Sequence, residues 1–235
     1  MSPRIFLLSP AHCGGERARL VLSQRARFDL ARRLRARQGA SLGEVFSFLS
    51  GLYFRGKLAY ARSFARAPAG VPGIMVITPC EGLRSPDVRV GLPLLRRYGR
   101  VGIDPRDARY RRPLMRDARA LVAALKDTPG WEVVLLGSVA SGKYAELLTD
   151  AFGERLVFPA DFVGRGDMSR GGLLLRCVAD GRELDYVPLL NAKRRGPRPA
   201  RLLPLGRRRS GLGADVTVRQ DVAVAAACLP PLSAL

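Results

Sequence analysis

The chain has 235 residues, and forty lysine and arginine residues outnumber twenty aspartate and glutamate residues, which gives a formal net charge of +20 at pH 7. Such a surplus favours a polyanionic partner, because it attracts phosphates and releases their counterions on binding. Four scattered cysteines without a CxxC pair exclude a zinc ribbon and a small disulfide scaffold, and no apolar run is long enough for a membrane-spanning helix. We therefore expect a cytoplasmic protein that binds nucleic acid and does not associate with a membrane.

Up to residue 105, short apolar runs alternate with segments of helical spacing. The runs predict buried strands over 5–8, 74–77 and 101–105. The helical spacing predicts helices over 16–37 and 43–66. We expect a break at Ser50-Gly51 in the second helix, and we expect its basic side chains Arg55, Lys57 and Arg62 to lie away from the apolar face.

After residue 105 the alternation continues and then gives way to a basic segment. Helices are expected over 114–126 and 143–152, and strands over 132–136 and 157–159. The segments 173–178 and 184–187 predict a hairpin. Arginine and proline crowd into residues 193–235, which predicts a flexible tail whose Arg194 and Arg195 contact phosphates.

This alternation predicts a single α/β domain over residues 1–192, with a mostly parallel or mixed central sheet flanked by helices. In such sheets, functional groups gather in the loops at the carboxyl ends of the strands. Three polar loops meet this condition, over 9–15, 78–87 and 137–143. We expect them to form a pocket for an exposed nucleotide.

The sharpest local motif runs from Gly137 to Lys143, with Gly142 before the lysine, after one expected strand and before a helix. P-loop proteins use this shape to wrap backbone N–H groups around phosphates. Tyr144 stands where a P-loop has the Ser or Thr that holds Mg²⁺, which argues against the alternative of a nucleotide hydrolase. A plain turn that holds one phosphate at a helix N-terminus is the other interpretation.

Two further segments carry chemistry. His12, the single histidine, lies beside small residues in the first strand-end loop, where a site is expected. One histidine and scattered cysteines do not indicate a zinc site, and we expect no cofactor. The glycine-rich segment 164–172 contains Arg165 and Arg170, whose guanidinium groups are suited to binding a phosphate. A surface turn is the alternative interpretation of this segment.

Taken in order, several motifs resemble those of the YaaA-like peroxide-stress proteins and related bacterial domains. Ser9-Pro10-Ala11-His12 stands where that family tends to have Ser-Pro-Ala-Lys, so His12 replaces a lysine. The further matching segments are Gly56 to Arg62, Thr78 to Asp87, Gly137-Ser138 with Lys143-Tyr144, and Arg165 to Arg170. The resemblance covers roughly residues 4–176.

The resemblance implies an α/β fold that binds DNA in a DNA damage or oxidative stress response. It also makes a DNA glycosylase, acting on a modified or damaged base, an alternative function. Such enzymes flip the base into a pocket, where Asp87 or Asp167 would activate water or stabilise the cationic centre, with His12 as the alternative base. The expected nucleic-acid-binding residues are Ser9, Arg55, Lys57, Arg62, Ser138, Lys143, Tyr144, Arg165, Ser169, Arg170, Arg194 and Arg195.

Overall fold

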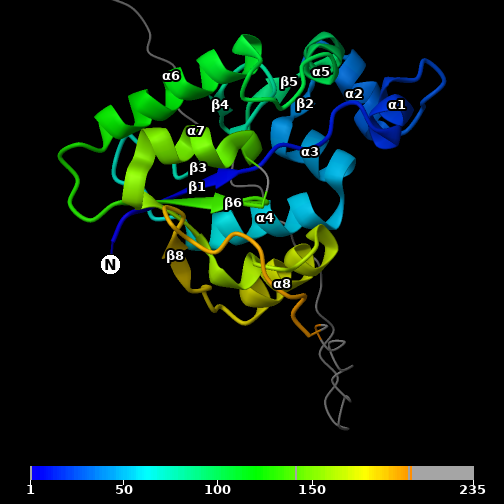
Figure 1. The fold of residues 1–235 in the computed structure, drawn as a ribbon. Helices are drawn as coiled ribbons and strands as arrows, with labels where there is room; N and C mark the ends of the chain where they lie inside the picture. The colour runs from blue at the N-terminus through cyan, green and yellow to red at the C-terminus, as the bar shows by residue number, and fades with distance from the viewer. Residues whose placement is uncertain (1, 141, 201, 203–235) are drawn as a thin grey trace, which may run out of the picture. The chain divides into compact units, whose positions relative to one another are not determined.

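A six-stranded sheet in the order β4-β3-β1-β6-β7-β8 forms the centre of the computed structural model, which describes residues 2–140, 142–200 and 202 (Figure 1). The inner strands are parallel: β1 (Arg4–Leu8), β3 (Ile74–Ile77), β6 (Glu132–Leu136) and β7 (Leu156–Pro159). The edge strands are antiparallel to their neighbours: β4 (Leu83–Arg84) and β8 (Tyr186–Pro188). This arrangement confirms the predicted α/β class.

The inner strands are continuous apolar runs because helices cover both faces of the sheet. Ile5 to Leu8 in β1 and Val133 to Leu136 in β6 are fully buried. Arg4 pairs with Glu132 and Leu8 with Leu136, so these two strands end at the same level. The loops that follow them therefore begin side by side at one edge of the sheet.

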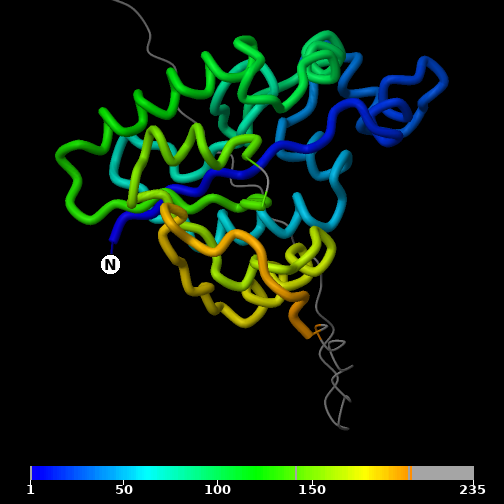
Figure 2. The backbone as a smooth tube through the Cα atoms, in the orientation of Figure 1, coloured from blue at the N-terminus to red at the C-terminus, as the bar shows by residue number. Residues whose placement is uncertain are grey.

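Helices α6 and α7 lie on one face of the sheet, and α4 and α8 lie on the other (Figure 1, Figure 2). The remaining helices gather beyond the carboxyl ends of the central strands, where β2 (Ala40–Ser41) and β5 (Arg89–Val90) form a second, small sheet. The helices are α1 (Glu16–Leu22), α2 (Asp29–Arg35), α3 (Leu42–Ser50), α4 (Leu52–Phe64), α5 (Leu92–Gly99), α6 (Ala108–Ala124), α7 (Gly142–Phe152) and α8 (Asp167–Ala179), with 3₁₀ turns at Gly153–Arg155 and Ala160–Phe162.

Helices α4 and α8 cross at very short range through two glycines. A Cβ atom at Gly56 would lie 2.7 Å from the carbonyl oxygen of Gly171. A Cβ atom at Gly171 would lie 2.9 Å from backbone atoms of Leu52. Because such distances exclude any larger residue, glycine is required on both sides of the crossing. The crossing also brings the beginning of α8 close to the middle of α4.

Several expected elements differ from the structure. The expected helix over 16–37 is two helices, because the chain is extended at Ser23 and Arg35 turns back to donate a hydrogen bond to the Ala26 carbonyl at 2.9 Å. The expected strand over 101–105 is an irregular loop that contains the Asp104–Arg106 ion pair. The helix expected over 114–126 begins earlier, after the N-cap Asp107.

The expected late hairpin is also wrong. Residues 173–178 belong to α8, and β8 pairs with β7 instead. The buried residues of this segment, Leu173, Leu174 and Cys177, have helical spacing, which a short apolar run does not distinguish from a strand. The break at Ser50-Gly51 is confirmed: Gly51 has a φ of 64° and separates α3 from α4.

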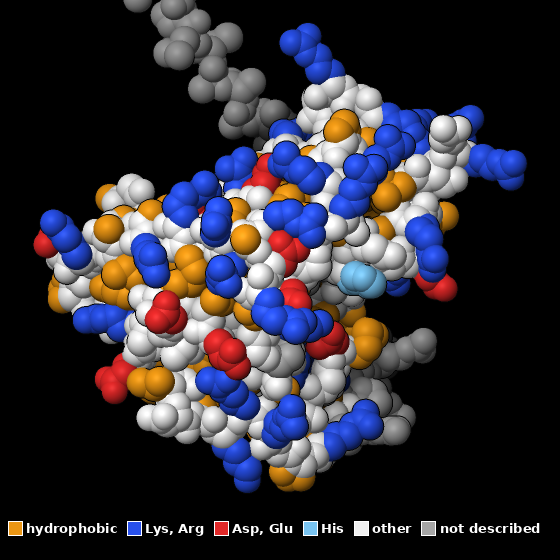
Figure 3. All heavy atoms as spheres, turned by 45° about the horizontal axis from the view of Figure 1, so that its top comes forward, with side chains coloured by type: hydrophobic (Ala, Val, Ile, Leu, Met, Phe, Trp, Pro, Cys, Tyr) orange, Lys and Arg blue, Asp and Glu red, His pale blue; other side chains and the backbone are white. Residues whose placement is uncertain are grey.

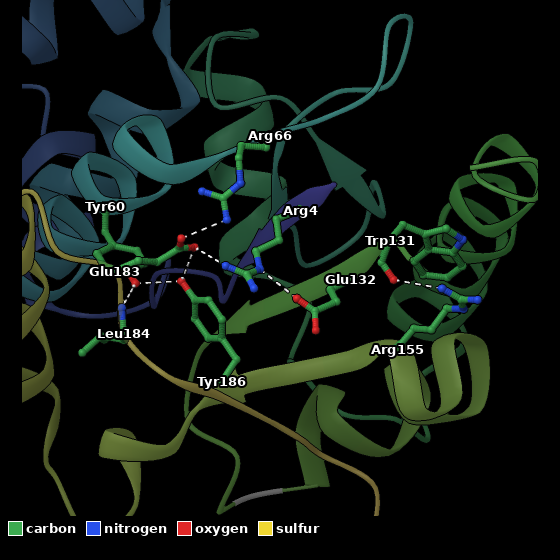
Figure 4. A network of polar contacts seen from close by, with 9 residues as sticks. All are labelled: Arg4, Tyr60, Arg66, Trp131, Glu132, Arg155, Glu183, Leu184 and Tyr186. Carbon is green, nitrogen blue, oxygen red and sulfur yellow. Dashed lines mark hydrogen bonds and ion pairs between the residues drawn. The ribbon is translucent and has the colours of Figure 1, made fainter. Parts of the chain in front are cut away.

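A polar network holds the amino ends of β1 and β6 to the segment before β8 (Figure 4). Arg4 donates to Glu132 at 2.8 Å and pairs with Glu183 at 2.9 Å, and Arg66 pairs with the same Glu183 at 2.9 Å. Tyr60 accepts a hydrogen bond from the backbone N–H of Leu184 at 2.7 Å, and its Oη lies 2.7 Å from that of Tyr186. This network lies at the edge of the sheet opposite the strands' carboxyl ends, so its role is structural.

Each helix in the described part of the chain is too short or too polar to cross a membrane. The start of the expected tail packs on the domain: a Cβ atom at Gly164 would lie 2.0 Å from the carbonyl oxygen of Pro197. Residues 203–235 of the expected tail lie outside the described residues.

Candidate functional site

The strand order creates a crevice at the carboxyl ends of β1 and β6. The chain leaves β1 toward β3 on one side and later returns to the other side as β6. In open α/β sheets, such a reversal separates the following loops and leaves a gap where ligands bind. A cavity of about 430 Å³ lies there. Its lining includes seven predicted site residues: Ser9, His12, Lys57, Ser138, Lys143, Tyr144 and Asp167.

Lys57 extends from α4 to the floor of this cavity. Its Nζ donates hydrogen bonds to the Ser9 carbonyl oxygen at 2.7 Å and to Ser9 Oγ at 2.8 Å. Nζ also lies 4.5 Å from the ring centre of Tyr53 and 4.8 Å from that of Phe54. The residue is only 1% exposed, which corrects the expectation that it lies away from the core. The polar end of β1 supplies the acceptors that make its burial possible.

Burial lowers the pKa of Lys57 to about 7, because the ammonium loses its hydration. The negative charge of Asp167 opposes this shift, and the positive charge of Arg170 adds to it. Both hydrogen bonds that the described structure gives Nζ are to Ser9, and neither reaches a carboxylate. Near neutral pH, Lys57 therefore exchanges between an ammonium and a free amine, as a general base requires.

Two buried tyrosines complete the cavity floor. Tyr144 forms a side-chain hydrogen bond with Ser9. Tyr53 Oη is buried beside the guanidinium of Arg170, which opposes the effect of burial on the pKa of this tyrosine. Burial raises the pKa of both tyrosines, so both remain neutral O–H donors near pH 7.

Glycine at position 137 leaves space for this arrangement. A Cβ atom there would lie 2.8 Å from both Ser9 Cβ and Tyr144 Oη. The first glycine of the P-loop-like motif is thus explained by the contact between the loops after β1 and β6. Lys143, in the first turn of α7, and His12 are exposed at the mouth of the cavity.

Asp167 is the carboxylate of the site. It begins α8, its side chain is 68% exposed, and it pairs with Arg170 at 3.4 Å. Arg170 itself is 6% exposed and donates to the Phe162 carbonyl oxygen through Nη2 at 2.9 Å and Nε at 3.2 Å. These contacts occupy the guanidinium that the sequence assigned to a phosphate.

Asp87 lies apart from the cavity. It forms a surface ion pair with Arg62 at 2.9 Å, in which both side chains are more than half exposed. The loop over 78–87 has a structural role instead: Thr78 donates to the Gly82 carbonyl at 2.9 Å and accepts from the Glu81 N–H at 3.0 Å. The expected pocket of three loops is therefore formed by two of them together with α3, α4 and the start of α8.

The other predicted basic residues are dispersed. Arg165 and Ser169 line a separate hollow of about 360 Å³ with Arg176 and Arg198. Arg55 is exposed on α4 and does not line the cavity. Arg194 is half-buried and Arg195 is exposed, and both lie in irregular chain after β8.

Sequence reasoning missed a set of nine exposed arginines that lie mainly on α5, α6 and the loop between them. We call this set the arginine row: Arg84, Arg96, Arg97, Arg100, Arg109, Arg111, Arg112, Arg116 and Arg119. It also missed Tyr53, although this tyrosine precedes Lys57 by one helical turn, a spacing that places two side chains together. The high density of arginine between residues 84 and 119 could have predicted a basic surface. The local sequence did not show that these arginines lie together on the surface of α5 and α6.

The chain matches no model of a protein family, and searches of curated proteins and of solved structures found no match. The function must therefore be inferred from the residues of the site and of the surface around it.

Proposed function

We propose that this protein binds nucleic acid, with DNA favoured, and that the arginine row holds its phosphates. The observation that carries the proposal is a series of neighbouring arginine-lined hollows that begins beside the cavity. The first, of about 200 Å³, is lined by Cys13, Gly14, Arg96 and Arg100, directly after His12 at the cavity mouth.

The next two hollows continue along α6. Arg100 also lines a hollow of about 640 Å³ with Arg97, Arg109 and Arg116. Arg116 in turn lines one of about 630 Å³ with Arg112 and Arg119. Lysine and arginine side chains crowd over this face of the molecule (Figure 3). A strand of phosphates along such a series would release counterions at each contact.

The arginines of the row differ in whether a carboxylate already occupies them. Four are in ion pairs: Arg84 and Arg97 pair with Glu81, and Arg109 and Arg116 pair with neighbouring aspartates. Of the other five, Arg111 donates to the Pro105 carbonyl oxygen at 3.3 Å. The four that we select are in no ion pair among the described residues: Arg96, Arg100, Arg112 and Arg119. Exposed guanidinium groups without a carboxylate partner bind phosphate without first breaking an ion pair.

The test is salt-dependent binding to labelled single-stranded and duplex DNA, with RNA for comparison. Replacing the four selected arginines by alanine should weaken binding and flatten the plot of log affinity against log salt by about 3 to 4. Arg182→Ala, an exposed arginine after α8, is the matched control. Equal binding by the variant and the wild type, or no binding at low salt, would refute the proposal.

A second candidate is a DNA glycosylase-like hydrolase. It is supported by Asp167 and His12, which line one cavity at the end of the arginine row. Asp167→Asn should abolish release of a modified base and leave DNA binding intact, whereas Asp87→Asn should retain both, since Asp87 lies elsewhere. Base release by Asp167→Asn at the wild-type rate would contradict this candidate. The link to DNA damage or oxidative stress rests on the YaaA-like motifs.

A further inference from the structure

Ser9 and Lys57 form a pair of reactive groups at the floor of the cavity, and Tyr144 also hydrogen-bonds Ser9. Ser9 is the first residue after β1 and is 6% exposed, and its Oγ lies 2.8 Å from Lys57 Nζ. The backbone also fixes Lys57, because the Ser9 carbonyl oxygen accepts a second hydrogen bond at 2.7 Å. A serine hydroxyl within hydrogen-bond distance of a proton acceptor is the arrangement that activates a nucleophile.

Burial favours the free amine of Lys57. Lys57 has no hydrogen-bonded carboxylate among the described residues, and it is only 1% exposed, so its Nζ is shielded from water. The pKa of about 7 means that a substantial fraction carries a free lone pair at neutral pH. The lone pair can then accept the proton of Ser9 Oγ along the existing contact.

A hydrogen-bond donor for a developing oxyanion is also present. Tyr53 is 5% exposed and lines the cavity, and its buried Oη lies beside the guanidinium of Arg170. Since a guanidinium has no acceptor, it can only donate to Oη, and the O–H proton of Tyr53 remains available to a ligand. Preformed donors of this kind stabilise tetrahedral intermediates of acyl transfer.

We propose that Ser9 is a nucleophile and Lys57 its general base, and that together they hydrolyse a carboxylic ester bound in this cavity. As Ser9 Oγ bonds to the ester carbon, its proton passes to Lys57 Nζ, and the carbonyl electron pair moves to the oxygen, which Tyr53 Oη hydrogen-bonds. When the carbon–oxygen bond of the ester breaks, Lys57 returns the proton to the departing alcohol.

Water then completes the cycle. A water molecule attacks the acylated Ser9 and gives its proton to Lys57. Collapse of this second intermediate breaks the bond to Ser9 Oγ, which recovers the proton from Lys57 as the carboxylic acid leaves. The sum is ester plus water to acid plus alcohol, and no other reactant is needed.

The cavity mouth indicates the substrate class. Lys143 and His12 are exposed there, and the arginine row begins directly beyond. The substrate is therefore an ester whose alcohol part carries an anionic group such as a phosphate, and whose acyl part enters the cavity of about 430 Å³. This activity goes beyond nucleic-acid binding and does not depend on it.

The test uses the full chain and p-nitrophenyl acetate as a minimal ester. Reaction mixtures are quenched at short times, and the site of acetylation is mapped by mass spectrometry of peptides. We expect acetylation of Ser9 in the wild type, at a rate that rises with pH through about 7 as Lys57 loses its proton. Ser9→Ala should abolish that modification, and Lys57→Met should slow it at least a hundredfold.

Ser63→Ala and Lys126→Met are the matched controls, since Ser63 lies in the last turn of α4, Lys126 lies in the turn after α6, and both are exposed and do not line the cavity. They should be acetylated at Ser9 like the wild type. Circular dichroism verifies that each variant is folded, and the wild-type mapping stands even if one of them is not. Absence of acetyl-Ser9 in the wild type, acetylation of Lys57 in its place, or an unchanged rate in a folded Lys57→Met variant would overturn the proposal. DNA binding measured on the same samples reports separately on the arginine row.

Discussion

Replacement of Lys57 by methionine should change how the free energy of unfolding depends on pH. In the folded state burial lowers the pKa of Lys57 to about 7, whereas in the unfolded chain the side chain is hydrated and has its ordinary pKa near 10.5. Between these values the unfolded state binds more protons than the folded state. By linkage, the Lys57 contribution to stability therefore increases as the pH rises through this range.

The size of the effect follows from the two pKa values. Where the folded state is neutral and the unfolded state is charged, stability changes by about 1.4 kcal/mol for each pH unit. Since the folded state is only half deprotonated near pH 7, the wild type should gain about 2 kcal/mol relative to Lys57→Met between pH 7 and pH 9. Methionine also removes both hydrogen bonds to Ser9, which adds a cost of about 1–3 kcal/mol that does not depend on pH.

Urea unfolding of both proteins at several pH values measures the difference. Lys126→Met is the control, because the Lys126 side chain is 74% exposed and its removal should not produce this slope. If the difference between the wild type and Lys57→Met stays constant from pH 7 to pH 9, Lys57 is not a desolvated amine, and the argument for its role as a base fails.

Two further predictions concern the framework that positions the site. Gly56→Ala should destabilise the fold by about 1–3 kcal/mol in chemical denaturation, because its Cβ would lie 2.7 Å from the Gly171 carbonyl oxygen. The control Gly172→Ala should be neutral or stabilising, since its Cβ would meet only Leu202 at 3.7 Å. If both variants lost the same free energy of unfolding, this would argue against the close crossing of α4 and α8. Tyr60→Phe should lower the free energy of unfolding by about 1–3 kcal/mol, because it leaves the Leu184 N–H without its acceptor. Tyr110→Phe is the control and should lower it less, since Tyr110 Oη has no partner among the described residues. A lower melting temperature for Tyr110→Phe than for Tyr60→Phe would contradict the network in Figure 4.

The apolar runs were sufficient to locate the central strands. Residues 5–8, 74–77 and 132–136 are observed as strands within one residue of the expected bounds. Strands buried on both faces must be apolar throughout, so the local sequence carries their signal. The positions of these strands also predicted the loops at their carboxyl ends. Five predicted site residues in or next to these loops line the cavity: Ser9, His12, Ser138, Lys143 and Tyr144.

The predictions were wrong where contacts with a distant part of the chain decide the structure of a segment. Residues 173–178 are apolar enough for a strand, but they are helical because Gly171 permits a close contact with α4. Asp87 and Asp167 look alike as acidic residues in polar loops. Only the fold separates them, since the crossing of α4 and α8 brings Asp167 to the cavity and the turn over 78–87 leaves Asp87 on the surface.

The sequence by itself determined the α/β class, the central strands and the positive charge, because hydrophobic periodicity and composition are local properties of the chain. The tertiary structure decided which charged residues line the cavity and which lie elsewhere on the surface. A lysine on a helix is normally exposed. Lys57 is buried because the two glycines at 56 and 171 bring α8 against α4, and because Ser9, forty-eight residues earlier, follows β1 directly and accepts its hydrogen bonds. Contacts between such distant residues, and the desolvation that follows from them, are absent from any local pattern.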